Sequence, residues 1–169
     1  MNLDGPVPYE PASHDVSAFD CGSDAQTRWL RQVARSAQAA RTARVYVVTP
    51  AGESRVVAYH AVAAASVVQE DASQALLESA GRSPVPVILL ARLGVDVAVQ
   101  GQGLGAALVK DAMLRAHQAS ETIGARALLV HAESERARDF YLHLAEFEVS
   151  PTHSLHLILL MSEIQRILR

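Results

Sequence analysis

Three glycines within six residues, Gln100-Gly101-Gln102-Gly103-Leu104-Gly105, constrain the fold of this chain more than any other feature. They follow an apolar run over residues 87–99, which we expect to be a buried strand, and precede an amphipathic helix predicted over residues 106–123. Glycine lets the backbone approach a ligand closely. The first amides of a helix are unpaired and lie at the positive end of its dipole. The glycine loop and the start of the helix after it are therefore predicted to bind an anion such as a phosphate or pyrophosphate.

Several interpretations of this loop remain open from its residues alone. The loop could be a strand-to-helix turn that holds no ligand. The Walker pattern for nucleoside triphosphates is absent. Gly101, Gly103 and Ala106 fit the looser dinucleotide form G-x-G-x-x-A, and Glu133 ends the next predicted strand, where an acid could bind a ribose. Its place in the chain disfavours that form, because only 36 residues follow Glu133, too few to complete a nucleotide-binding half.

The rest of the chain predicts one domain of alternating strands and helices. Its 169 residues suit a single domain, and residues 1–13, with three prolines, read as an irregular lead-in or a segment along an edge. Alternation of this kind favours an α/β or α+β sheet domain. The predicted elements are a helix from Asp24 capped by Ser23, a hairpin of residues 44–49 and 55–64, a short helix over 70–80, a loop over 82–86, a strand over 127–131, a helix from Ser134 and a strand over 156–161.

Composition excludes several classes of protein. A single cysteine excludes a disulfide framework, and we expect Cys21 to be a packed, inert thiol. There is no apolar run of about 18 residues and no basic-then-apolar N-terminus, so we expect a cytoplasmic protein without a membrane span. The seven histidines show no recognisable ligand spacing, so no metal is expected and the histidines receive no role.

The net charge of −3 hides a segregation of charge along the chain. Residues 1–24 hold five acids and no Lys or Arg, whereas residues 25–52 hold five Arg and no acid. Arg28, Arg31 and Arg35 fall on one face of the first predicted helix, opposite an apolar face of Leu30, Val33, Ala34 and Ala37. This stripe is predicted to contact phosphate groups. The alternative is a solvated helix face, which would normally mix the two signs of charge.

Four stretches carry a resemblance to a known family. Gln100-x-x-Gly103-x-Gly105 resembles the Q/R-x-x-G-x-G/A signature of the GNAT superfamily of N-acetyltransferases. Phe19-Asp20-Cys21-Gly22, the run from Val85 through Asp96, and Asp139-Phe140-Tyr141 are similar to its toxin branch, from bacterial toxin–antitoxin pairs. The resemblance extends from about residue 9 to residue 161. One departure is Leu144-Ala145-Glu146-Phe147, which replaces the usual Phe-Gly-Phe.

The resemblance implies a GNAT fold, in which a central mixed, mostly antiparallel sheet is splayed at the acetyl-CoA site and flanked by helices. It implies that Tyr141 is the general acid that protonates the departing thiolate. The implied acetyl-CoA-binding residues are Leu93, Val95, Gln100, Gly101, Gln102, Gly103, Gly105 and Ala106. The candidate tRNA-binding residues are Arg28, Arg31 and Arg35, with Arg82 and Arg92 as additions from across the cleft.

The resemblance also implies a function and partners. It predicts a toxin of a type II toxin–antitoxin system that acetylates the α-amino group of aminoacyl-tRNA and so blocks translation. It further predicts a ribbon-helix-helix antitoxin, operator DNA bound through the toxin–antitoxin complex, and a homodimer. The alternatives are an N-acetyltransferase of a small-molecule or protein amine, and a nucleotide-binding regulatory module without catalysis.

Overall fold

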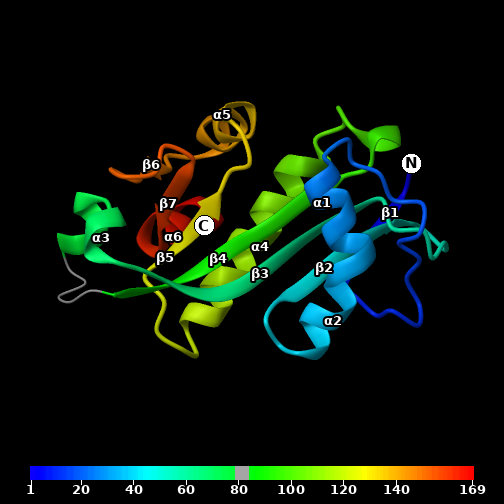
Figure 1. Cartoon of the computed structure of the whole chain (residues 1–169), viewed down its shortest axis with the longest axis horizontal. Helices are drawn as coiled ribbons and strands as arrows, with labels where there is room; N and C mark the ends of the chain where they lie inside the picture. The colour runs from blue at the N-terminus through cyan, green and yellow to red at the C-terminus, as the bar shows by residue number, and fades with distance from the viewer. Residues whose placement is uncertain (79–83) are drawn as a thin grey trace. The chain divides into compact units, whose positions relative to one another are not determined.

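A mixed sheet forms the frame of the protein, and the computed structural model describes residues 1–78 and 84–169 (Figure 1). Over these residues, seven strands follow the order β1 (Leu3–Pro8), β2 (Arg44–Pro50), β3 (Ala58–Val67), β4 (Val85–Val95), β5 (Ala127–His131), β7 (His156–Leu160) and β6 (Glu148–Val149). β4 pairs with β5 in parallel, and the pairs β1–β2, β2–β3, β5–β7 and β6–β7 are antiparallel. The prediction of a mixed, mostly antiparallel sheet with helices is confirmed.

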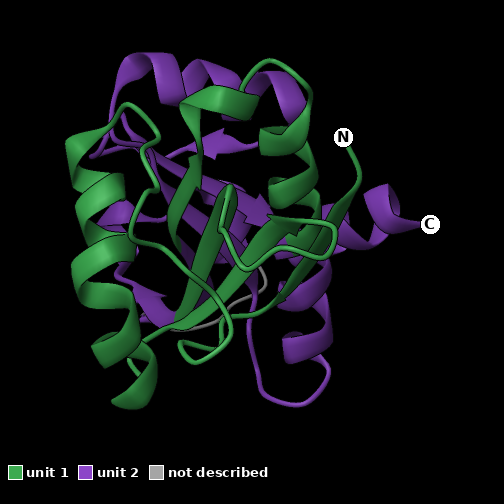
Figure 2. Ribbon diagram, turned by 90° about the vertical axis from the view of Figure 1, so that its right-hand side faces the viewer, with its two compact units in different colours: residues 1–63, 91–111 green, residues 64–90, 112–169 purple. Residues whose placement is uncertain are grey.

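Two compact units share the chain, as the colours of Figure 2 show. Unit 1 comprises Met1–Ala63 and Ala91–Asp111, and unit 2 comprises Ala64–Leu90 and Ala112–Arg169. Strands β3 and β4 and the helix after the glycine loop each contribute residues to both units. Each unit is described separately below.

The first strands of unit 1 correct the expectation for the N-terminus. Residues Leu3–Pro8 form strand β1, which pairs antiparallel with β2 (Arg44–Pro50) at the edge of the sheet. The segment is therefore not an irregular lead-in, and the alternative of a segment along an edge describes it correctly. Edge strands tolerate proline because one side of the strand has no partner. The predicted hairpin is confirmed: β2 pairs antiparallel with β3 (Ala58–Val67).

The first helical segment changes its winding partway. It consists of α1 (Asp24–Arg28), the π-helical turn η1 (Trp29–Val33) and α2 (Ala34–Ala39). The Ser23 side chain caps it by accepting from the Gln26 amide, as predicted. Leu30 and Ala34 are buried as expected, but Val33 is 41% exposed. The wider π turn rotates Val33 out of the apolar face, which a uniform period of 3.6 residues would not reveal.

Helix α4 (Leu104–Ser120) is tied to β3 by a buried polar pair in unit 1. The His60 side chain is fully buried, and its Nε2 lies 2.8 Å from Oδ2 of Asp111. Apolar packing accompanies this pair, because Leu108 joins the core cluster of Val48, Val57 and Ala58. The first half of α4 is therefore fixed against the sheet by both apolar and polar contacts.

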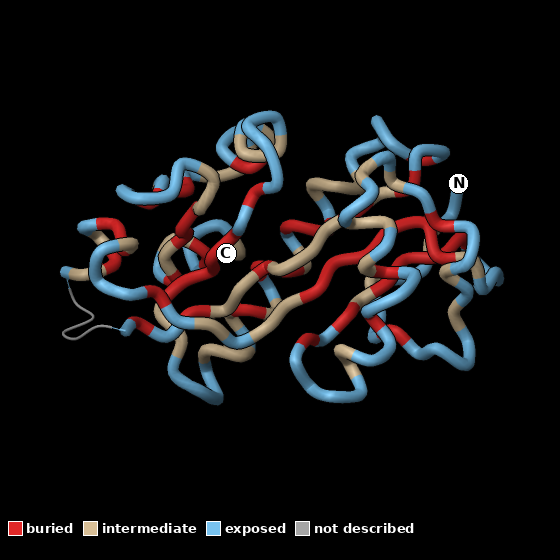
Figure 3. Tube along the Cα trace, viewed as in Figure 1, coloured by how far each residue is buried: buried red, intermediate tan, exposed pale blue. Residues whose placement is uncertain are grey.

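Unit 2 contains the remaining predicted elements. The strand over Ala127–His131 is confirmed as β5, and Ser134 caps helix α5 (Glu135–Leu144) by accepting from the Ala137 amide. β7 (His156–Leu160) pairs with β5, and the short strand β6 (Glu148–Val149) pairs with β7. Helix α6 (Met161–Leu168) follows β7. Buried residues make up most of β5 and the middle of β7 (Figure 3).

The strand before the glycine loop differs from its predicted bounds. β4 spans Val85–Val95, so it includes Pro86, which the sequence predicts to lie in a loop. The last part of the predicted strand is instead the 3-10 turn η3 (Val97–Val99). The helix predicted over 70–80 is a 3-10 turn, η2 (Gln69–Asp71), followed by α3 (Gln74–Glu78), and its last two residues lie outside the described part of the chain. No helix in the described ranges is long and apolar enough to cross a membrane.

Candidate active site

The glycine loop is open to a ligand. Gly101 and Gly103 adopt φ angles of 80° and 82°, in the left-handed region that glycine favours. A Cβ atom added at either residue would meet no other atom within 4 Å. Helix α4 begins at Leu104, two residues before the predicted Ala106, so the exposed loop leads directly into the unpaired amides of its first turn. The loop therefore has the geometry and polarity of an anion site.

Strand β4 contributes its backbone to this region. The side chains of Leu93 and Val95 pack against the core cluster that contains Val57 and Leu108, so a ligand beside β4 would meet main-chain groups. Gly94 is required by close packing. A Cβ atom there would lie 3.0 Å from Cε1 of Tyr59 and 3.2 Å from Sγ of Cys21.

The Gln100 side chain is exposed, and its amide bonds to two main-chain carbonyls beside the loop. Its Nε2 donates to the carbonyl oxygens of Val95, at 2.9 Å, and Cys21, at 3.0 Å. Both partners are acceptors, so only the amide nitrogen fits this position. The Gln100 side chain therefore organises the loop, and the Val95 carbonyl already has a donor. This arrangement was not foreseen from the motif, because a signature gives residue types and no side-chain direction.

The arginines of the predicted stripe are exposed on unit 1. Arg28, Arg31 and Arg35 are all exposed, and Arg92 on β4 is half-buried. The Arg92 guanidinium lies 5.7 Å from the ring centre of Trp29, a cation–π distance. Arg82 lies outside the described residues. Sequence reasoning missed Trp29, although it is the chain's one tryptophan and directly follows Arg28.

Tyr141 lies on α5 in unit 2 and is buried, with 7% of its surface exposed. Its ring makes edge contacts with Phe140, at 5.2 Å between ring centres, and with Phe147, at 6.0 Å. Burial raises the pKa of the Tyr141 phenol, and the nearby Glu133 carboxylate raises it further. The phenol is therefore fully protonated at neutral pH and can act as a proton donor.

The departure from Phe-Gly-Phe after α5 does not strain the chain. Ala145 ends the helix with a φ of −159°, an extended conformation that any residue adopts. Phe147 remains buried against Tyr141. The turn therefore keeps the aromatic contact without glycine.

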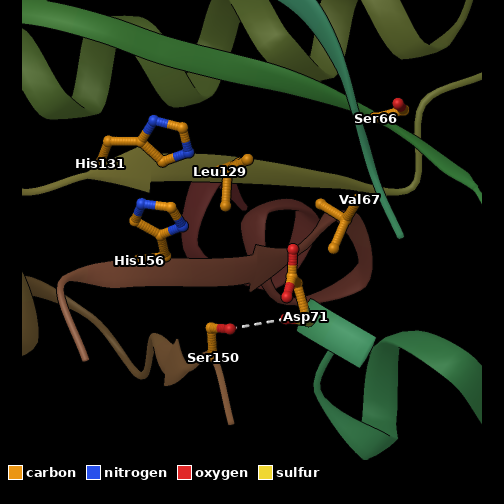
Figure 4. Close-up of a pocket in the computed structure, with 7 residues that line it drawn as sticks. All are labelled: Ser66, Val67, Asp71, Leu129, His131, Ser150 and His156. Carbon is orange, nitrogen blue, oxygen red and sulfur yellow. Dashed lines mark hydrogen bonds between the residues drawn. The ribbon is translucent and has the colours of Figure 1, made fainter. Parts of the chain in front are cut away.

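A second polar site in unit 2 is a pocket of about 170 Å³ beside β5 and β7 (Figure 4). The His131 and His156 rings stack in it at 3.8 Å between ring centres, and the His153 ring lies 4.4 Å from that of His156. Partial burial and the neighbouring imidazoles lower the pKa of both His131 and His156. Among the described residues, no group of three His, Cys, Asp or Glu side chains could hold a metal ion.

The structure groups the predicted residues by unit. The loop residues, Leu93, Val95 and the arginines at 28, 31, 35 and 92 belong to unit 1, whereas Tyr141 belongs to unit 2. Unit 1 thus carries the candidate anion site and the cationic surface. Unit 2 carries the candidate proton donor and the histidine pocket.

Comparison with known proteins identifies relatives over most of the chain. The model of the acetyltransferase (GNAT) family matches residues 23–147. A tRNA-acetylating toxin of Mycobacterium tuberculosis is 44% identical over 149 residues, which are 88% of this chain and 87% of that protein.

Solved structures of similar fold cover nearly the whole chain. A tyrosine-to-phenylalanine mutant of KacT aligns with a TM-score of 0.88 and 25% identity over 98% of both chains. A tyrosine-to-phenylalanine mutant of the AtaT toxin, bound to the C-terminus of the antitoxin AtaR and to acetyl-CoA, aligns with a TM-score of 0.81 and 25% identity over 99% of this chain and 97% of that one. The KacTA–DNA complex aligns with a TM-score of 0.78 and 26% identity over 95% of this chain and 94% of that one.

Proposed function

The chain belongs to the acetyltransferase (GNAT) family, in the branch of the tRNA-acetylating toxins, and we propose that it transfers the acetyl group of acetyl-CoA to the α-amino group of aminoacyl-tRNA. The 44% identity to such a toxin over 88% of the chain carries this proposal. Acetylation removes the nucleophilic amine that peptide-bond formation requires, so the reaction blocks translation.

We propose that the glycine loop holds the pyrophosphate of acetyl-CoA. The backbone amides of Gly101, Gln102, Gly103, Gly105 and Ala106 would donate to its oxygens, and the open space at Gly101 and Gly103 supports this fit. The backbone of β4 at Leu93 and Val95 would bind the pantetheine arm, since the side chains of both residues pack into the core. Gln100 would contribute by ordering the loop, because its side-chain amide is already bonded to two carbonyls.

Acetyl transfer needs a neutral amine and a proton for the departing sulfur. The α-amine has a pKa near 8, so a fair fraction is neutral at pH 7 without a dedicated base. We propose that Tyr141 donates its phenolic proton to the sulfur as the carbon–sulfur bond breaks. The proton lost by the attacking nitrogen then restores the phenol. A phenol with the usual pKa near 10 is already protonated at neutral pH, and burial raises the pKa of Tyr141 further, so the donor form is present.

We propose that Arg28, Arg31, Arg35 and Arg92 bind the tRNA phosphates, with Arg82 as a further candidate. The exposure of the first three and the absence of acids from residues 25–52 support this assignment. Guanidinium groups bind phosphate oxygens through two parallel hydrogen bonds. Arg92 is held against Trp29, which places its charge beside the first helical segment.

We propose that the chain works as one catalytic domain over residues 1–169, since the family model extends through both units. Its proposed partner is a ribbon-helix-helix antitoxin, and the complex of the two would bind operator DNA. The AtaT–AtaR and KacTA–DNA structures support these partners. A homodimer and a cytoplasmic location belong to the same proposal, the latter because aminoacyl-tRNA is a cytoplasmic substrate.

A translation reaction tests the proposed function. We expect purified protein with acetyl-CoA to stop translation and to produce N-acetylated aminoacyl-tRNA, detected by mass spectrometry of the amino acids released from tRNA. The matched control is Tyr141→Phe, which keeps the buried ring and removes the proton donor. If the wild-type protein acetylates free amines or peptides but no aminoacyl-tRNA, the proposed substrate is wrong.

A further inference from the structure

Hydrogen bonds join residue 20, before the first helical segment, to residues 96–97, which follow β4 and precede the glycine loop. The amide of Val97 donates to the carbonyl oxygen of Asp20 at 2.8 Å, and the amide of Asp20 donates to Oδ2 of Asp96 at 3.2 Å. Asp96 is 9% exposed whereas Asp20 is exposed, so this contact is partly buried. The end of β4 thus holds the turn that precedes the first helical segment.

Gln100 adds a contact that depends on a side chain of the loop itself. Its Nε2 donates to both the Val95 carbonyl oxygen, at 2.9 Å, and the Cys21 carbonyl oxygen, at 3.0 Å. Gln100 directly precedes Gly101, the first glycine of the loop. A change in the position of the loop backbone therefore moves the donor that holds Cys21.

The turn over residues 20–22, called the Cys21 turn below, is also bonded to α1. The Cys21 amide donates to Oγ1 of Thr27 at 3.1 Å, and its Sγ lies 3.3 Å from the same oxygen. Thr27 directly precedes Arg28, the first arginine of the stripe. A continuous path of hydrogen bonds thus runs from the glycine loop through Gln100 and Cys21 to the arginine-bearing helix.

We propose that Gln100 is a positioning residue that couples acetyl-CoA binding at the glycine loop to tRNA binding by the first helical segment. The inference rests on the proposed function, because it needs both ligands. A ligand that orders the loop fixes the Gln100 amide, which fixes the Cys21 turn and the helix that follows. The second ligand then binds a surface that is already ordered, so each ligand tightens the other.

The chemistry of the two acceptors makes the coupling testable at one side chain. Gln100→Glu has nearly the same shape but replaces the donor with a carboxylate oxygen facing two carbonyl oxygens. Gln100→Asn keeps the donor but is one methylene shorter, so it reaches at most one of the two carbonyls. Gln100→Arg keeps several N–H donors and can bridge both carbonyls. The first two variants should break the link, and the third should preserve it.

Binding measurements without turnover provide the test. Deacylated tRNA lacks the acceptor amine, so its affinity can be measured with and without saturating acetyl-CoA. For the wild-type protein we expect acetyl-CoA to lower the Kd of tRNA at least about fivefold, and tRNA to lower the Kd of acetyl-CoA by the same factor. The factor should fall to about one in Gln100→Glu and Gln100→Asn and persist in Gln100→Arg. Gln118→Glu, an exposed position on α4, is the matched charge control and should keep the wild-type factor.

Thermal melts of each variant separate loss of coupling from loss of folding, and Gln100→Arg provides rescue at the same position. The proposal is overturned if the wild-type factor is one, or if both Gln100→Glu and Gln100→Asn are folded and keep the wild-type factor. Wild-type protein that acetylates aminoacyl-tRNA with a factor of one would refute the coupling alone. Protein that neither binds tRNA nor acetylates aminoacyl-tRNA would refute the proposed function as well.

Discussion

The glycine loop of unit 1 and the Tyr141 region of unit 2 are built from different parts of the chain. At the loop, Gly101 and Gly103 offer backbone amides in open space, and the exposed Gln100 side chain bonds to two main-chain carbonyls and so holds the loop. At Tyr141, the functional group is one buried side chain whose ring contacts Phe140 and Phe147.

This difference determines how each region should respond to change. A backbone site keeps its donors in most substitutions and fails only when the backbone conformation is lost. A side-chain site fails when a single atom is removed. The loop should also be insensitive to pH because its amides do not titrate, whereas the Tyr141 phenol does.

The largest effect is expected from removing that single atom. We expect Tyr141→Phe to lower kcat by about 100-fold or more, within the 10²–10⁴ range of general acid catalysis. The KM for acetyl-CoA should change little, because the loop is untouched. Steady-state kinetics on a purified aminoacyl-tRNA measure both constants. A fall in kcat of less than about fivefold would show that another group or water protonates the sulfur.

The pH dependence of kcat in the wild-type enzyme is a second test of Tyr141 as the general acid. A general acid acts while it is protonated, and burial raises the pKa of Tyr141 above its usual value near 10. The kcat should therefore stay level as the pH passes through 10 and fall only at higher pH. Since aminoacyl esters hydrolyse in alkali, single-turnover measurements after a rapid pH jump are appropriate. A decline centred at or below pH 10 would contradict the assignment.

The loop and Tyr141 were also predictable to different degrees. The position of the glycine loop was predictable from spacing alone, because strand, glycines and helix are local features of the chain, whereas its ligand needed the resemblance. Tyr141 needed the resemblance, since a tyrosine in an amphipathic helix is usually an ordinary core residue. The bond from Gln100 to the Cys21 carbonyl and the pairing of β1 with β2 depend on distant partners, so no local pattern shows them. The π-helical turn that exposes Val33 departs from the regular 3.6-residue period on which the helix prediction rests.

The next largest effect concerns the acceptor. Replacing Arg28, Arg31 and Arg35 together by Gln removes three exposed charges, and we expect the KM for aminoacyl-tRNA to rise by about a hundredfold. The slope of log affinity against log salt should become shallower by about two to three. The acetyl-CoA affinity should change far less.

The double substitution Arg166→Gln/Arg169→Gln, on exposed positions of α6 or after it, is the control and should leave the KM within about twofold. An unchanged salt slope in the triple variant would assign tRNA binding to another surface.

A smaller effect is expected at the loop backbone. Gly103→Ala places a Cβ in open space but strains a φ of 82°, which costs about 1–2 kcal/mol. The KM for acetyl-CoA should therefore rise about fivefold to thirtyfold while kcat at saturation stays near the wild-type value. Gly124→Ala is the matched control, because a Cβ there also meets nothing within 4 Å and lies far along the chain from the loop. If the two variants have equal KM values, the φ of Gly103 is not needed for cofactor binding.

The smallest effect is expected in the histidine pocket of unit 2, where we expect the stacked pair to affect stability. The pKa of both His131 and His156 is lowered in the fold, so the unfolded chain binds protons first as the pH falls. Stability contributed by the neutral pair is therefore present above about pH 6.5 and is lost as the pH falls through the lower pKa values of the fold. We expect His131→Gln/His156→Gln to lose less in Tm between pH 7 and pH 5 than the wild-type protein. His143→Gln, on an exposed position of α5, should lose as much as wild type. A double variant with the full acid-dependent loss would place the titrating groups elsewhere in the chain.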